Sequence, residues 1–297
     1  MSDTAPGSTA SVATGPPAGA PALVDVGWLA EHLDEPDLVV LDATMGPAPS
    51  PPRIRGARWF DHDVAMAAPG SGLPHTLPSI SRFQEQVRRL GVDEASRVIV
   101  YDGAGIFSSP RARWMLRRAG HRRVSVLDGG LPAWLDAGGP TESWPAGADP
   151  HEGPEPGDFT ASGSFEPAVV PMEELAGLLA DPGFVVVDAR SHERFTGAVP
   201  EPRPGLRAGH MPGAVNVPFT ELLVDGRTMR GPAELRAILD RAVPAGTRPV
   251  ASCGSGMTAT VVLLALELVG RDDGLLYDGS WSQWGGSDGG EVVTGET

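Results

Sequence analysis

The chain of 297 residues is long enough for two ordinary domains, and 41% hydrophobic with 21% charged residues indicates a globular protein rather than a disordered one. A net charge of −15 disfavours a nucleic-acid partner, which usually needs a basic face; arginines are concentrated only between residues 111 and 123. The single cysteine, Cys253, excludes an internal disulfide and a cysteine-rich zinc site, and it fits a reducing compartment. Because no run of eighteen apolar residues occurs, we expect no membrane span.

Residues 1–21 consist mostly of Ala, Pro, Gly, Ser and Thr, without a positive start or an apolar core. We therefore predict a disordered tail rather than a secretory signal, and a cytoplasmic protein. From Ala22 onward apolar patterns appear in regular succession. The expected elements are a helix at 26–33, a strand at 38–41, a loop at 45–56, a helix at 81–90 capped by Ser81, a strand at 97–102, a helix at 111–119 and a strand at 124–127. Strands that alternate with helices predict an α/β fold with a parallel sheet.

The second half of the chain repeats the first half. The matching anchors are Asp42 with Asp188, Asp102 with Cys253, and Trp134 with Trp284, at separations of 146, 151 and 150 residues. Three nearly equal separations indicate two copies of one domain. We predict a tail at 1–21, a non-catalytic domain at 22–145, a Gly- and Pro-rich linker at 146–166 and a catalytic domain at 167–297, each domain being a parallel sheet flanked by helices.

The lone cysteine follows a short apolar run, Val250-Ala251, and precedes Gly254-Ser-Gly256 and an apolar stretch from about Met257 to Gly270. This pattern predicts a strand, a tight turn and a buried helix. A thiol at that turn would face free backbone N–H groups and the positive end of the helix dipole, which favour the thiolate. The alternative is a cysteine that merely fills the core, but such a residue needs no Gly-Ser-Gly after it. The first copy has Asp102 at this place, so we expect one active site, with the first domain as a wall of its cleft.

These residues resemble the two-domain rhodanese sulfurtransferases. The resemblance is carried by Asp188-Ala-Arg190, Gly209-His-Met-Pro-Gly-Ala214, the loop Cys253-Gly-Ser-Gly-Met-Thr258, and Arg194-Phe-x4-Pro-Glu-Pro-Arg203. It extends over about residues 22–290. The loop looks most like that of the 3-mercaptopyruvate sulfurtransferase branch, with Met257 in place of Val.

The resemblance implies a double displacement without metal or cofactor. The Cys253 thiolate would take sulfur from a small-molecule 2-oxo acid thiol, release pyruvate and become a persulfide. The backbone N–H groups of 254–259, which include Gly254, Gly256, Met257 and Thr258, would hold the persulfide anion. The sulfur would then pass to an acceptor thiol, small or protein-borne such as thioredoxin, or to cyanide.

Further residues carry over from the resemblance one at a time. Arg194 and Arg203 match the family's substrate-clamping pair, since guanidinium groups bind a carboxylate bidentately. An ordinary ion pair is the alternative for each arginine, and we favour the clamp because the two are expected on one Pro-rich loop without helical spacing. Ser255 matches a loop serine that joins His75 and Asp63 in a proton relay, with Asp61 as the alternative carboxylate and a helix cap as the alternative role of the serine.

Two other features are assigned to structure rather than to catalysis. We interpret His210 as part of a turn, and the seven tryptophans as packing residues.

The neutral pair Gly254-Ser255 favours 3-mercaptopyruvate over the thiosulfate dianion, which needs cations beside the cysteine. A thiosulfate sulfurtransferase and a persulfide carrier that does not turn over remain alternatives. A Cys-x5-Arg phosphatase is disfavoured because position 259 is alanine and no arginine lies between 253 and 270.

Overall fold

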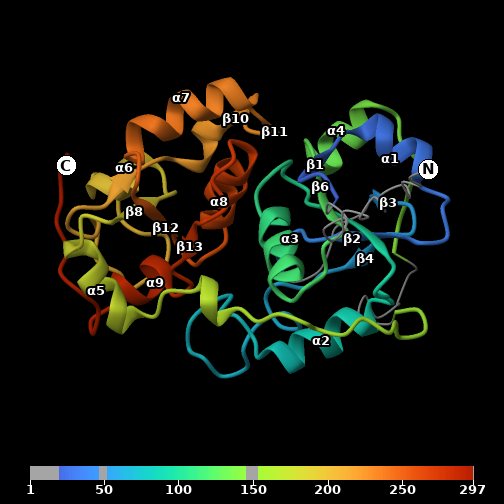
Figure 1. The fold of residues 1–297 in the computed structure, drawn as a ribbon, viewed down its shortest axis with the longest axis horizontal. Coiled ribbons are helices and arrows are strands. Elements are labelled where there is room, and N and C mark those ends of the chain that lie inside the picture. Colours follow the sequence, from blue (N-terminus) through green and yellow to red (C-terminus); the bar gives the residue numbers. More distant parts are fainter. Residues whose placement is uncertain (1–19, 47–51, 145–152, 297) are drawn as a thin grey trace, which may run out of the picture.

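The computed structural model describes residues 20–46, 52–144 and 153–296 and contains two α/β domains (Figure 1). The first domain has a five-stranded parallel sheet in the order β1-β6-β5-β2-β4. Its strands are β1 (Leu23–Val24), β2 (Leu38–Asp42), β4 (Arg58–Trp59), β5 (Arg97–Tyr101) and β6 (Val124–Leu127). A separate antiparallel pair joins β3 (Arg53–Ile54) to β7 (Thr141–Glu142). The predicted parallel architecture is confirmed.

Helices cover both faces of this sheet. They are α1 (Val26–His32), α2 (Ile80–Arg89), α3 (Ser109–Arg118) and α4 (Gly130–Asp136). Successive strand residues alternate between two apolar clusters, as parallel strands buried on both faces must: Val39 and Leu41 belong to one cluster, and Val40 to the other, which also contains Leu29 of α1 and Trp134 of α4.

The starts of two helices differ from the sequence-based prediction. The N-cap of α2 is Ser79, whose Oγ accepts the Arg82 N–H at 3.3 Å, and not Ser81. Helix α3 starts two residues before the predicted Arg111, because Pro110 suits the first helical turn, where its missing N–H has no intrahelical partner.

The second domain repeats this plan with a four-stranded parallel sheet in the order β13-β12-β8-β9. Its strands are β8 (Phe184–Asp188), β9 (Val215–Asn216), β12 (Arg248–Ser252) and β13 (Leu275–Leu276), and β10 (Leu223–Val224) pairs antiparallel with β11 (Thr228–Met229). Its helices are α5 (Met172–Ala180), α6 (His192–Thr196), α7 (Pro232–Ala242), α8 (Ala259–Leu268) and α9 (Ser280–Trp284), with 3-10 turns at Glu166–Ala168 and Phe219–Leu222. Five residue pairs join β2 to β5 and, in the same register, β8 to β12. This register makes Asp102 and Cys253 equivalent positions, each directly after its strand.

The two domains share one hydrophobic core. Helices α3 and α8 face each other between the domains (Figure 1), and a single apolar cluster includes Leu116 of α3 together with Leu264 of α8. Arg113 of α3 binds the Glu267 carboxylate of α8 through two hydrogen bonds of 2.8 Å. The contact between the domains is therefore tight along α3 and α8.

The described part of the linker, residues 153–166, lies along the first domain (Figure 1). Phe159 and Phe165 are buried, and Phe165 packs against Phe83 and Trp114. These aromatic contacts fix the path of the chain between the domains. The beginning of the predicted linker, 146–152, lies outside the described residues.

Two residues that the sequence analysis placed in the disordered tail, Ala20 and Pro21, contact the first domain. Residues 1–19 lie outside the described part of the chain, but Ala20 donates its N–H to the Arg122 carbonyl at 3.2 Å, and Pro21 accepts the Ser125 hydroxyl at 2.6 Å. These bonds attach residues 20 and 21 to the first domain. No helix in the described ranges is long and apolar enough to cross a membrane.

Candidate active site

Cys253 lies between β12 and α8, where its backbone is fixed by α9. Its N–H donates to the Ser280 hydroxyl at 3.1 Å, and its carbonyl accepts the Trp281 N–H at 2.9 Å. The next carbonyl, of Gly254, accepts the backbone N–H and the hydroxyl of Ser282 at 2.8 and 2.6 Å. The thiol-bearing residue is 2% exposed. The first turn of α9 thus holds the cysteine in one position.

The loop after the cysteine presents unused hydrogen-bond donors. Gly256 has a φ of 78°, so the chain turns and α8 begins at Ala259 rather than at the predicted Met257. No hydrogen bond within the described residues uses the backbone N–H groups of 254–258. Met257 and Thr258 are buried, and the Thr258 side chain does not cap the helix. Backbone donors at the start of a helix favour an anion.

The equivalent turn in the first domain is already occupied by an anion of its own. Asp102 Oδ2 accepts the backbone N–H groups of Phe107, Ser108 and Ser109 at 2.9, 3.0 and 2.9 Å, and the Ser109 hydroxyl at 2.7 Å. In the first copy of the repeat, the carboxylate of Asp102 therefore occupies the hydrogen-bond donors of this turn.

His75 brings the first domain to the cysteine loop. Its Nδ1 lies 2.9 Å from Ser255 Oγ, and its Nε2 lies 2.9 Å from Asp63 Oδ1. Since a carboxylate only accepts, Nε2 carries the proton and Nδ1 accepts the Ser255 hydroxyl. Burial lowers the pKa of His75, and the neighbouring Asp63 opposes that shift. The imidazole is therefore neutral near pH 7.

Of the two carboxylates that the sequence left open, Asp63 lies beside His75. Asp61 instead accepts the backbone N–H groups of Asp63, Val64 and Ala65 at 2.9–3.1 Å, which makes it the cap of a turn. The left-handed φ of 59° at His75 directs its ring toward the second domain.

The two arginines lie directly over the loop. A Cβ atom on Gly254 would lie 3.1 Å from Nη2 of Arg194 and 3.8 Å from Nη1 of Arg203. Arg194 lies on α6, so the expectation of a shared loop without helical spacing is wrong for this residue; Gly197, with a φ of 78°, ends the helix. Glycine at 254 leaves room for both guanidinium groups.

Glu201 orients one of these arginines. The carboxylate is 2% exposed and accepts Nη2 and Nε of Arg194 at 2.5 and 3.2 Å, and Nη1 of Arg190 at 2.8 Å. Arg203 makes no side-chain ion pair within the described residues, and its positive charge contributes to the lowered pKa of His75. The guanidinium of Arg203 is thus available to an anionic ligand beside the thiol.

Sequence reasoning missed an interdomain bridge that supports the site. Arg111 of α3, 1% exposed, donates to the carbonyls of Gly256 and His75 at 3.0 and 2.7 Å and to Asp278 Oδ1 at 2.7 Å. Asp278 Oδ2 also accepts the Leu77 N–H at 2.8 Å. One buried ion pair therefore links the cysteine loop to the histidine loop. Its only sequence signal is an arginine inside an otherwise apolar helix face.

His210 lies apart from this cluster. Its Nδ1 bonds to the Phe195 carbonyl at 2.8 Å, and its ring stacks on Phe195 with centroids 3.8 Å apart. These contacts agree with the turn role expected from the sequence. In the described ranges, no group of three or more His, Cys, Asp and Glu side chains is placed to hold a metal ion.

The protein has two tandem α/β domains, one with a cysteine directly after a central strand and the other with a carboxylate at the equivalent position. Comparisons with known proteins identify the family to which this arrangement belongs. The Rhodanese-like domain family matches residues 25–137 and 171–287, and the chain belongs to this family. It is 42% identical over 274 residues to the 3-mercaptopyruvate sulfurtransferase of Escherichia coli K12, covering 88% of this chain and 94% of that protein. It is 36% identical over 302 residues to the mitochondrial thiosulfate/3-mercaptopyruvate sulfurtransferase 1 of Arabidopsis thaliana, covering 93% and 78%. The crystal structure of SseA from Escherichia coli matches with a TM-score of 0.74 and 38% identity, over 88% of this chain and 99% of SseA.

Proposed function

We propose that the protein is a 3-mercaptopyruvate sulfurtransferase in which Cys253 carries the sulfur. The observation that carries this proposal is the position of Cys253: its loop of unused N–H groups lies under Arg194 and Arg203, with the Ser255–His75 pair alongside. The relatives named above, at 36–42% identity over most of both chains, support the same activity.

In the first half-reaction the Cys253 thiolate attacks the donor's sulfur. The S–S bond forms, the C–S bond breaks, and its electron pair leaves with the carbon as the enolate of pyruvate. The proton of the donor's thiol passes through Ser255 Oγ to Nδ1 of His75 and returns to the enolate carbon, which gives pyruvate. Asp63 accepts Nε2–H and stabilises the imidazolium formed in between. No external oxidant or reductant is needed.

The product persulfide is an anion one atom longer than the cysteine side chain. In our proposal it occupies the unused N–H groups of residues 254–258. Asp102 supports this placement, because its carboxylate accepts three backbone N–H groups and one hydroxyl at the equivalent turn of the first domain. Since that turn is already filled and offers no thiol, we propose that the first domain is non-catalytic and supplies His75 and Asp63.

The donor's carboxylate and 2-oxo group are assigned to the two arginines. The guanidinium of Arg194 is held in a fixed orientation by Glu201, and the guanidinium of Arg203 has no ion-pair partner within the described residues. The residues that follow the cysteine, Gly254 and Ser255, are neutral. We therefore propose at least a tenfold preference in kcat/KM for 3-mercaptopyruvate over thiosulfate, equivalent to about 1.4 kcal/mol of transition-state binding. Thiosulfate remains the second candidate donor, as the name of the Arabidopsis relative includes it.

In the second half-reaction an acceptor thiolate attacks the outer sulfur and regenerates Cys253. We propose a small thiol or a protein thiol such as thioredoxin as acceptor, with cyanide able to replace it in an assay. A persulfide-forming thiol needs reducing surroundings, which supports action in the cytoplasm.

The test is pyruvate release from 3-mercaptopyruvate with a thiol acceptor. Cys253→Ser should abolish turnover, and Arg203→Ala should mainly raise KM, because the arginine binds ground and transition states alike. Arg241→Ala, on the exposed side of α7, is the matched control and should behave as wild type. Mass spectrometry of donor-treated protein should show a gain of about 32 Da at Cys253. A protein that gains this mass once but releases no further pyruvate is a carrier, and one that gains no mass refutes the nucleophile.

A further inference from the structure

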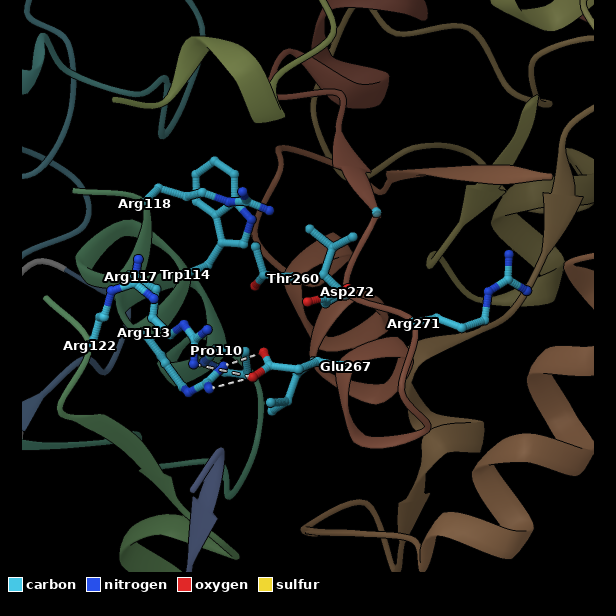
Figure 2. Close-up of a pocket in the computed structure, with 13 residues that line it drawn as sticks. Pro110, Arg113, Trp114, Arg117, Arg118, Arg122, Thr260, Glu267, Arg271 and Asp272 are labelled. Atoms are coloured by element: carbon cyan, nitrogen blue, oxygen red, sulfur yellow. Dashed lines mark hydrogen bonds and ion pairs between the residues drawn. The ribbon is translucent and has the colours of Figure 1, made fainter. Parts of the chain in front are cut away.

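A cavity lies between the domains, along the α3–α8 contact. It measures about 230 Å³ and is walled by α3 on one side and α8 with the turn after it on the other (Figure 2). Helix α8 starts just after the cysteine loop and has ten residues, so the end that carries Arg271 and Asp272 lies roughly 15 Å from that loop. The cavity is distinct from the candidate active site.

The lining is strongly basic in a chain whose net charge is −15. Its cations are Arg113, Arg117, Arg118, Arg122 and Arg271, and its acids are Glu267 and Asp272. Figure 2 shows the Glu267 carboxylate taken up by Arg113 and Arg117, at 2.8 and 3.4 Å.

The remaining arginines of α3 and its following turn form no direct ion pair with Glu267 or Asp272 of the cavity. Arg118 and Arg122 make no ion pair within the described residues, and Arg118 lies over the Trp114 ring, 5.7 Å from its centroid. Arg271 donates to the carbonyls of Val243 and Thr247 at 3.1 and 2.7 Å and points away from α3 (Figure 2). The positive charge on the α3 side of the cavity is therefore largely uncompensated.

The surroundings make these charges costly when the cavity is empty. Burial lowers the pKa of Arg117 in spite of Glu267, and the nearby Arg113 and Arg122 lower it further. Burial and the charges of Arg117 and Arg248 lower the pKa of Arg118, and the carboxylates of Asp272 and Glu267 offset only part of that shift. Like charges held together in a partly desolvated place are relieved by a bound anion.

The wall also offers a neutral donor without an acceptor. Trp114 Nε1 is buried and has no hydrogen-bond partner among the described residues, whereas buried indole N–H groups are usually paired. The same ring lines the cavity and stacks on Phe165, so its orientation is fixed. This donor is an observation independent of the arginine cluster.

We propose that this cavity is a binding site for a small multivalent oxyanion of the phosphate class, bound by Arg118 and Arg122 with Trp114 Nε1–H as a neutral donor. Guanidinium forks match the paired oxygens of a tetrahedral oxyanion. The enclosed volume fits a compact ligand better than a protein surface. Bound between α3 and α8, the anion stabilises the contact between the domains.

The experiment is calorimetric titration with inorganic phosphate and pyrophosphate at constant ionic strength, with chloride as the reference anion. We expect saturable binding by the wild type, at least tenfold weaker binding by Arg118→Gln and by Arg122→Gln, and unchanged binding by Arg89→Gln. Arg89 is an exposed arginine on α2 outside the cavity. Arg89→Gln therefore removes one positive charge, as the two cavity variants do, without changing the lining of the cavity. Phosphate binding no stronger than chloride, or equal affinity in all four proteins, would overturn the proposal.

Two further variants distinguish phosphate binding in this cavity from phosphate binding at the cysteine loop. Trp114→Phe keeps the ring but removes the N–H, and should weaken phosphate binding several-fold. Arg203→Ala removes anion binding at the cysteine loop and should leave the titration of the cavity unchanged; loss of the signal in this variant would assign it to the active site instead. Arg122→Gln changes an exposed side chain and should retain pyruvate release, so this proposal and the proposed function can fail separately. Tight binding of a polyglutamate peptide without phosphate binding would overturn the proposal, because the cavity would then bind an acidic protein segment rather than a small oxyanion.

Discussion

Replacing Arg111 by methionine should destabilise the whole molecule and misplace the cysteine loop. The change leaves the buried Asp278 carboxylate without its cation and removes donors from the Gly256 and His75 carbonyls. Breaking a buried ion pair from one side costs about 3–5 kcal/mol. Because the two domains share one apolar cluster, we expect this loss in a single unfolding transition. A shift of the loop by about 1 Å would lower kcat by up to about a hundredfold.

The assay is urea unfolding of wild type, Arg111→Met, Asp278→Asn and the double variant. Asp278→Asn keeps an acceptor for the Leu77 N–H, so the cycle isolates the charge pair, with an expected coupling of about 1–3 kcal/mol. Arg55→Met, which breaks an exposed pair with Asp34, is the control and should cost less than about 1 kcal/mol. Strictly additive effects of the two buried substitutions would refute the argument.

Other predictions concern the relay, pH and the loop glycines. Asp63→Asn should lower kcat by about a hundredfold. Because Asp63 raises the pKa of His75, its loss should also move the acidic limb of the kcat–pH profile to lower pH; movement to higher pH would contradict the assigned contact. Burial lowers the pKa of His62 well below its ordinary value, so below about pH 6.5 the unfolded chain binds a proton that the folded chain does not. The free energy of unfolding should therefore fall as pH drops from 6.5 to 5, with a smaller fall in His62→Asn; equal slopes would exclude this cause. Gly254→Ala places a Cβ atom 3.1 Å from a guanidinium and should raise KM several-fold. Gly256→Ala needs a φ of 78° and places a Cβ atom 2.8 Å from a backbone carbonyl, so it should cost about 2 kcal/mol and most of the activity; equal KM and stability in the two glycine variants would contradict both assignments.

The repeat and the strand, turn and helix around Cys253 could be predicted from sequence because both are carried by local patterns. Apolar runs predicted β2 and β5 nearly to the residue, since a strand buried on both faces must be continuously apolar. For β12 the short run Val250-Ala251 predicted only the middle of the strand. The turn after Cys253 is contiguous, and its glycines specify its backbone. Helix starts were less predictable, because several serines near α2 are equally good caps in isolation.

The candidate site as a whole depends on contacts that local sequence does not encode. His75 and Ser255 are 180 residues apart, and Arg111 and Asp278 are 167 residues apart. Sequence alone left Asp61 and Asp63 as alternatives; the structure distinguishes them because the oxygens of Asp61 are taken up by three backbone N–H groups.

The arginines between residues 111 and 123 illustrate the same division. The sequence shows that they are concentrated on one helix and the turn after it. Which of them form ion pairs depends on the residues that the second domain places opposite each one. Arg113 forms an ion pair with Glu267, whereas Arg118 and Arg122 form no ion pair within the described residues. Local pattern therefore determined the strands, the repeat and the turn that carries Cys253. Only the packing of one domain on the other decided which charges are neutralised, which donors stay free and which side chains surround Cys253, because these depend on distances between segments remote in the chain.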